Sequence, residues 1–263
     1  MPPVFALSPE AAIDLHVIDQ DGCADWLAAQ PAPVADWAAL NGFSGSIGQT
    51  LMVPAPDGGA QMALAGYGTA AQRARRRFVL AAAADKLPEG TYAIASGLEG
   101  PALDMECFGW LMTGYAFDRY APGKAGKAAL AAPQGLDAGA IEALVAGECL
   151  TRDLINTPFS DMGPAELQGA AEALAAAHGA TVKVIEDDAL LEANLPLIHT
   201  VGRASDRRPR LIDIHWGSEG PKLTLVGKGV CFDTGGLNLK PGASMGLMKK
   251  DMGGAATVLG LTR

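Results

Sequence analysis

The segment Lys222–Gly236 reads KLTLVGKGVCFDTGG, a short apolar strand pattern that runs into a glycine-rich turn with charged side chains. A nearly continuous apolar run such as 222–227 is typical of a strand buried in a parallel sheet. In open α/β sheets, ligands bind beyond the carboxyl ends of the strands, where Lys228 and Asp233 follow in this chain. The sequence therefore predicts an α/β fold with a ligand site at this edge.

A second carboxylate is expected at the same edge, because Asp251 precedes an Ala/Gly-rich helical stretch. Carboxylates are hard oxygen ligands for divalent cations. A lysine beside a dication loses its proton more readily, so Lys228 could coordinate as a neutral amine, while Lys240 could stay protonated and stabilise an oxyanion. From spacing alone, a metal site of Lys228, Asp233 and Asp251 and a salt-bridged structural cluster are equally compatible with the sequence.

The sequence gives less support to three other kinds of site: a phosphate loop, a cysteine nucleophile and a histidine metal site. The Gly227–Gly229 turn lacks the GxxxxGK[ST] spacing of a phosphate loop. We expect Cys231 to be a buried strand residue rather than a nucleophile. The four histidines have no HExxH spacing and are interpreted as structural, one at a helix end and two in strands or loops: His16, His178, His199 and His215.

Two domains are predicted. Residues 121–135 are rich in Ala, Gly, Pro and Lys and lack a helical pattern, which is typical of a boundary. We therefore expect a small N-terminal α/β domain over 1–132 and the first part of a mostly parallel, doubly covered sheet domain over 133–263. In the second domain, helices are predicted over 137–156, 161–178 and 187–193, and strands over 181–185, 210–216 and 222–227.

A triple arginine marks the first domain. We predict one helix from the N-cap Thr69 to Ala84, with residues 75–77 on it. These arginines suggest either a phosphate-binding patch or the solvated face of the helix, and the acidic composition favours the solvated face.

Composition narrows the classes of function. The 263 residues include 20 basic and 29 acidic side chains, a formal net charge of −9, which argues against nucleic-acid and anionic-membrane partners. The four cysteines are far apart, which disfavours a disulfide scaffold. With neither an apolar run of about 18 residues nor a basic leader, a cytoplasmic location is expected.

Three motifs together resemble the leucyl aminopeptidase family of cytosol aminopeptidases, which includes peptidases A and B. The first is residues 226–241, in which Asp233 and Lys240 lie 5 and 12 residues after Lys228; the second is MKKDMGGAAT at Met248–Thr257, with Asp251 lying 23 residues after Lys228. The third, TRDLINTP at 151–158, resembles the family's ARDLVNTP. The resemblance covers about residues 137–263.

The resemblance implies a metallo-aminopeptidase that releases N-terminal, preferably apolar, residues through a water activated by two divalent ions, Mn²⁺ or Zn²⁺. It implies that Lys228, Asp233 and Asp251 bind metal and also contact substrate. Lys240 would be the catalytic residue that contacts the substrate carbonyl, and Met248 would line the pocket for the N-terminal side chain. The implied partners are peptides with a free N-terminus and further copies of the chain, since family members are hexamers.

The family's second acidic motif, Asn-Thr-Asp-Ala-Glu-Gly-Arg, does not occur in these 263 residues. We therefore expect three metal ligands of five, one catalytic residue of two, and at most one weakly held ion in this chain. The alternative to an active enzyme is a truncated, inactive chain that serves as a metal-binding or subunit-interaction module.

Overall fold

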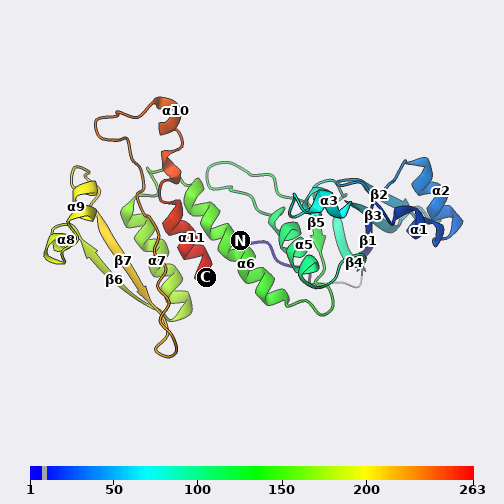
Figure 1. Cartoon of the computed structure of the whole chain (residues 1–263), viewed down its shortest axis with the longest axis horizontal. Coiled ribbons are helices and arrows are strands. Elements are labelled where there is room, and N and C mark those ends of the chain that lie inside the picture. The colour runs from blue at the N-terminus through cyan, green and yellow to red at the C-terminus, as the bar shows by residue number, and fades with distance from the viewer. Residues whose placement is uncertain (8–10) are drawn as a thin grey trace. The chain divides into compact units, whose positions relative to one another are not determined.

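The computed structural model describes residues 1–7 and 11–263 and divides into two compact units, Met1–Val145 and Ala146–Arg263 (Figure 1). The division falls within a helix, so it does not test the predicted boundary at 132/133, which stays a prediction. No helix in the described ranges is long and apolar enough to cross a membrane. The first unit contains β1 (Ile13–Asp19), α1 (Cys23–Ala28), α2 (Ala32–Leu40), β2 (Thr50–Pro54), β3 (Ala60–Gly68), α3 (Ala70–Arg73), α4 (Ala81–Ala84), β4 (Gly90–Ser96), α5 (Gly100–Met112), β5 (Ala128–Leu130) and the start of α6 (Ala138–Asn156).

A five-stranded sheet with the order β2-β3-β1-β4-β5 forms the centre of the first unit. All neighbouring pairs are parallel except β2 with β3, and Leu15 of β1 is paired with Ala63 and Ile94 on its two sides. Leu15 and Tyr92 are fully buried, as expected for the middle of a covered sheet. The predicted α/β class with a mostly parallel sheet is confirmed, but this sheet lies in the first unit, whereas it was expected in the second domain.

The predicted helix from Thr69 to Ala84 is wrong, although its start is right. Thr69 forms a capping box with Gln72, but α3 ends at Arg73, and α4 begins only at Ala81. Between them, Phe78 adopts the left-handed φ of 58°, and its side chain lies against Gly109, where a Cβ would be only 2.6 Å away. A left-handed residue cannot continue a right-handed helix, so the packing of Phe78 in this conformation separates α3 from α4.

The second unit contains helices and one antiparallel strand pair. Strands β6 (Thr181–Glu186) and β7 (Arg210–His215) pair with Thr181 opposite His215, and α7 (Pro164–His178) packs on this pair (Figure 1). The predicted helices and the first two strands are confirmed, but the strand pair is antiparallel. The elements are the rest of α6, α7 (Pro164–His178), β6 (Thr181–Glu186), α8 (Ala189–Glu192), α9 (Pro196–Gly202), β7 (Arg210–His215), α10 (Gly242–Met245), η2 (Met248–Lys250) and α11 (Gly253–Leu261).

Helices α6 and α11 approach each other through glycines. A Cβ on Gly260 would lie 2.5 Å from the carbonyl oxygen of Gly147, and Thr151 Oγ1 donates to the carbonyl of Ala256 at 3.2 Å. The two helices share a core with α7, whose members include Leu154, Leu167, Met252 and Leu259. This packing fixes the beginning of α11, and with it Asp251.

Two local predictions in this unit are wrong. Residues 222–227 form no strand, and Leu223 and Val226 are 81% and 88% exposed. An extended segment becomes a strand only where a second strand pairs with it, and no described strand does so here. His199, expected in a strand or loop, lies in α9.

Candidate metal centre

Lys228 and Asp251 meet because two backbone segments approach without side chains between them. Lys228 Nζ donates to Asp251 Oδ1 at 2.7 Å, and Ala255 N donates to the carbonyl of Lys228 at 2.9 Å. A Cβ on Gly227 would lie 2.6 Å from the Cα of Ala255, and one on Gly254 would lie 2.9 Å from the nitrogen of Lys228. These glycines therefore serve the approach of the chain to itself.

Asp233 and Lys240 form the second half of the site. Asp233 Oδ1 accepts from the backbone nitrogen of Gly235 at 2.7 Å, and Asp233 Oδ2 accepts from Lys240 Nζ at 2.7 Å. Gly235 and Gly236 have φ values of 76° and 84°, which turn the chain back toward Asp233. Lys240 Nζ also lies 3.8 Å from Met248 Sδ, so Met248 is brought to the same group.

The charges of the two halves act on each other. The hydrogen bond from Lys240, followed by that from Gly235, lowers the pKa of the Asp233 carboxyl, and the positive charge of Lys228 lowers it further. All five predicted site residues thus gather in one region of the second unit: Lys228, Asp233, Lys240, Met248 and Asp251.

The site contains an oxygen donor of the kind that a divalent cation prefers. Asp251 Oδ2 is buried and has no hydrogen-bond partner among the described residues, although its other oxygen is paired. An orphaned buried carboxylate oxygen costs free energy unless a cation or a donor reaches it. Both lysines remain paired with carboxylates, so a cation would compete with their ammonium groups.

One contact of the site was missed at the sequence level. Lys249 Nζ donates to the carbonyl of Asn156 at 3.1 Å, at the C-terminal end of α6. A cation at this helix end is favourable because the last carbonyls lack intrahelical partners. Lys249 was not among the predicted site residues, although it lies in the MKKD motif. Next to Asp251, the fully buried Met252 holds the turn in the core.

Two other candidate sites of the second unit are less suited to chemistry: the thiol of Cys231 and a second group of metal-ligand residues. Cys231 is 5% exposed, and burial raises the pKa of its thiol to about 11, which makes it a poor nucleophile. A different group of metal-ligand types, Asp187, Asp188 and His199, has ligand atoms within 4.8 Å of one another. Arg208 already pairs with Asp187 and occupies that carboxylate.

Comparison with known proteins agrees with this arrangement. The α/β fold and the close pairing of carboxylates with lysines are compatible with an α/β protein that binds a divalent cation. The family model described as "Cytosol aminopeptidase family, catalytic domain" matches residues 149–263, and that described as "M17 aminopeptidase, N-terminal domain" matches residues 13–133. The chain belongs to the cytosol aminopeptidase family, also called the leucyl aminopeptidase family, and the resemblance seen in the sequence is confirmed.

Individual relatives support the same assignment. A Gluconobacter oxydans protein named "Probable cytosol aminopeptidase" is 36% identical over 89% of this chain and 51% of its own length. The crystal structure of cytosol aminopeptidase from Coxiella burnetii has a TM-score of 0.85 and 36% identity, over 97% of this chain and 55% of that one. The bottromycin maturation enzyme BotP in complex with Mn has a TM-score of 0.76 and 30% identity, over 96% and 55%. The chain spans about half the length of the relatives it matches.

Proposed function

We propose that the protein is a metal-dependent aminopeptidase that removes N-terminal, preferably apolar, residues from peptides. The observation that carries the proposal is the convergence of Asp233, Asp251, Lys228 and Lys240 in two close ion pairs beside an orphaned carboxylate oxygen. Such a set of oxygen and amine donors suits a divalent cation. We choose manganese as the test ion, because a solved structure of BotP is in complex with Mn.

In this proposal, Asp233 and Asp251 would hold the cation together with Lys228, which can coordinate only as a neutral amine. Divalent ions of this kind supply an activated water and polarise a carbonyl. The complete family site holds two such ions, Mn²⁺ or Zn²⁺, and the residues of this chain provide for one. Gly227 and Gly254 position Lys228 by letting the chain pass close to α11.

Lys240 is the proposed catalytic residue. Its ammonium group is held by Asp233 at 2.7 Å, so its protons are directed and its charge is kept near the carboxylates. When a peptide binds, this group donates a hydrogen bond to the carbonyl oxygen that becomes an oxyanion. Met248, next to Lys240, contributes an apolar and adaptable surface for the N-terminal side chain, which favours leucine-like residues.

The wider setting is proposed from the family resemblance. The catalytic domain starts near residue 133, the protein acts in the cytoplasm, and copies of the chain assemble into a hexamer.

The test measures metal binding and hydrolysis separately. The purified chain is titrated with Mn²⁺ by calorimetry and assayed on leucine amide with and without Mn²⁺. Asp251→Asn keeps the shape of the side chain but removes a charged ligand. Asp206→Asn is the matched control, since Asp206 is an exposed aspartate of the same unit. We expect Asp251→Asn to weaken Mn²⁺ binding at least about tenfold, whereas Asp206→Asn leaves it unchanged.

The possible results test the metal site and the catalytic activity separately. Equal Mn²⁺ affinity in Asp251→Asn and the unsubstituted chain would refute the metal site. Binding without hydrolysis of leucine amide would refute catalysis by this chain alone and favour the metal-binding or subunit-interaction module. Metal-dependent hydrolysis that is lost in Asp251→Asn would support the whole proposal.

A further inference from the structure

The triple arginine of the first unit borders a hollow that the proposed function does not use. A hollow of about 430 Å³ is lined by Arg73, Ala74, Arg75, Arg76, Arg77 and Met105, none of which is acidic. We call residues 73–77 the arginine loop. Because this segment is not helical beyond Arg73, its arginines do not form the face of a helix, contrary to the prediction.

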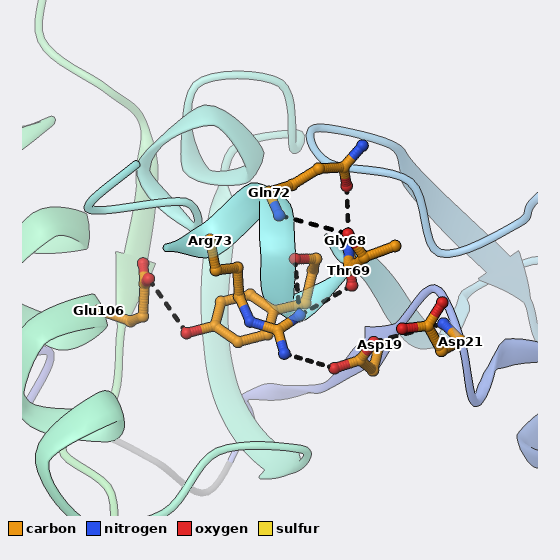
Figure 2. Close-up of polar contacts among 8 residues, drawn as sticks. Asp19, Asp21, Gly68, Thr69, Gln72, Arg73 and Glu106 are labelled. Carbon is orange, nitrogen blue, oxygen red and sulfur yellow. Dashed lines mark hydrogen bonds and ion pairs between the residues drawn. The ribbon is translucent and has the colours of Figure 1, made fainter. Parts of the chain in front are cut away.

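One end of the arginine loop is held by Arg73. Its guanidinium donates to Asp19 Oδ2 at 2.6 Å and to the carbonyl of Gly68 at 2.8 Å (Figure 2). It also lies over the ring of Tyr67, 4.4 Å from the ring centroid. Tyr67 in turn donates to Glu106 at 3.2 Å, and Glu106 is only 3% exposed. Arg73 is thus neutralised and fixed by residues on two strands and, through Tyr67, on α5.

The other end of the arginine loop is held by packing. Phe78, in the left-handed conformation, lies on Gly109 and contacts the ring of Phe108 at a centroid distance of 5.5 Å. The backbone of Leu80 donates to the buried Glu106 at 2.8 Å. A loop fixed at both ends loses little backbone conformational entropy when a ligand binds to it.

The other three arginines of the loop carry positive charges that no ion pair recorded among the described residues neutralises. Arg75, Arg76 and Arg77 are exposed, and the structure records no ion pair for them with any described acidic residue. Three adjacent guanidinium groups repel one another and attract anions, which is notable in a chain with a net charge of −9. Guanidinium groups match phosphate oxygens in pairs of parallel hydrogen bonds.

We propose that the arginine loop and Met105 form a binding site for a small molecule that carries a linear di- or triphosphate group. Such a group presents several anionic oxygens, each of which can accept from a guanidinium group, and the hollow of about 430 Å³ is lined by several arginines. A single monoanion engages one fork only and binds more weakly. The site lies in the first unit and is independent of the metal centre.

The test uses inorganic tripolyphosphate as the probe, titrated into the full chain by calorimetry without divalent metal. ATP and monophosphate are parallel arms: equal binding of ATP and tripolyphosphate indicates recognition of the phosphate chain alone. The loop variant replaces three arginines by glutamine, and the control variant removes the same charge from exposed residues elsewhere in the first unit. The loop variant is Arg75→Gln, Arg76→Gln and Arg77→Gln, and the control variant is Arg119→Gln, Lys124→Gln and Lys127→Gln.

We expect saturable binding of tripolyphosphate at one site, weakened at least about tenfold in the loop variant and less than about twofold in the control. A second variant, Met105→Glu, leaves every arginine in place and adds a negative charge to the wall of the hollow. Met105 is 42% exposed, so the fold tolerates the change, and binding should again weaken. Absence of saturable binding, equal losses in the loop and control variants, or unchanged binding in Met105→Glu would each overturn the proposal.

Discussion

The crossing of α6 and α11 gives the sharpest test of the packing in the second unit. Gly147→Ala adds one methyl group where α6 faces the backbone of Gly260, and Gly169→Ala makes the same change in α7, where nothing lies within 4 Å of the added Cβ. Both glycines lie inside helices, so both substitutions gain about 1 kcal/mol of helix propensity. Only the first meets an obstacle.

The magnitude follows from what the methyl group meets. At Gly147, the obstacle is the carbonyl of Gly260, a backbone group that cannot rotate away as a side chain would. Overpacking of this kind costs roughly 1–3 kcal/mol, and an immovable neighbour places the cost at the upper end. After the propensity gain, we expect Gly147→Ala to lower the free energy of unfolding by about 1–2 kcal/mol. Gly169→Ala should raise it by about 1 kcal/mol.

Urea unfolding followed by far-UV circular dichroism measures the difference. With a slope of about 1–3 kcal/mol per molar urea, the two variants should have midpoints separated by about 1 M, on opposite sides of the unsubstituted protein. Amide hydrogen exchange in α11 should accelerate in Gly147→Ala alone. If Gly147→Ala were as stabilising as Gly169→Ala, the two helices would not be in backbone contact at this point, and the account of how Asp251 is positioned would be wrong.

Three titrations test side chains elsewhere. Burial lowers the pKa of His16, whose Nδ1 lies 2.8 Å from Ser96 Oγ, so the folded state favours the neutral ring. The free energy of unfolding should therefore fall as the pH drops below about 6.5, the usual pKa of histidine. In acid-unfolding curves, His16→Asn should flatten this pH dependence. Burial, followed by the charge of Glu106, raises the pKa of Tyr67 to about 12. The late part of the absorbance rise near 295 nm should therefore be smaller in Tyr67→Phe, in which Tyr92, whose pKa burial also raises, still titrates late. A rise complete by pH 11 in the unsubstituted protein would contradict this. Burial raises the pKa of Cys231 to about 11, so a disulfide reagent at pH 8 should modify it only after urea is added, and fast modification of the folded chain would contradict its burial.

Much of the candidate site was predictable because its residues lie in one short stretch with distinctive glycines. The residues expected at the site do gather, but the sequence could not say which lysine pairs with which aspartate. That choice depends on how α11 packs on α6 and α7, which is a property of the tertiary core around Met252. The burial of Asp251 Oδ2 has the same origin.

The wrong predictions have physical causes of two kinds. The apolar pattern of 222–227 has the composition of a strand, but a strand also needs a paired neighbour, which composition does not reveal. The helix predicted from Thr69 to Ala84 had a correct N-cap and good helix formers. It was interrupted by the packing of Phe78 on Gly109, a contact between segments distant in sequence.

The two ion pairs of the candidate metal centre close loops of very different length. Asp233 and Lys240 are 7 residues apart, whereas Lys228 and Asp251 are 23 apart. Loop-closure entropy grows with the logarithm of length, so the longer loop costs about 1 kcal/mol more to close. During folding, the Asp233 side of the site can therefore assemble from nearby residues alone, while the Asp251 side must wait for α11 to dock. The sequence separation of the paired residues therefore predicts the order in which the two halves of the site form.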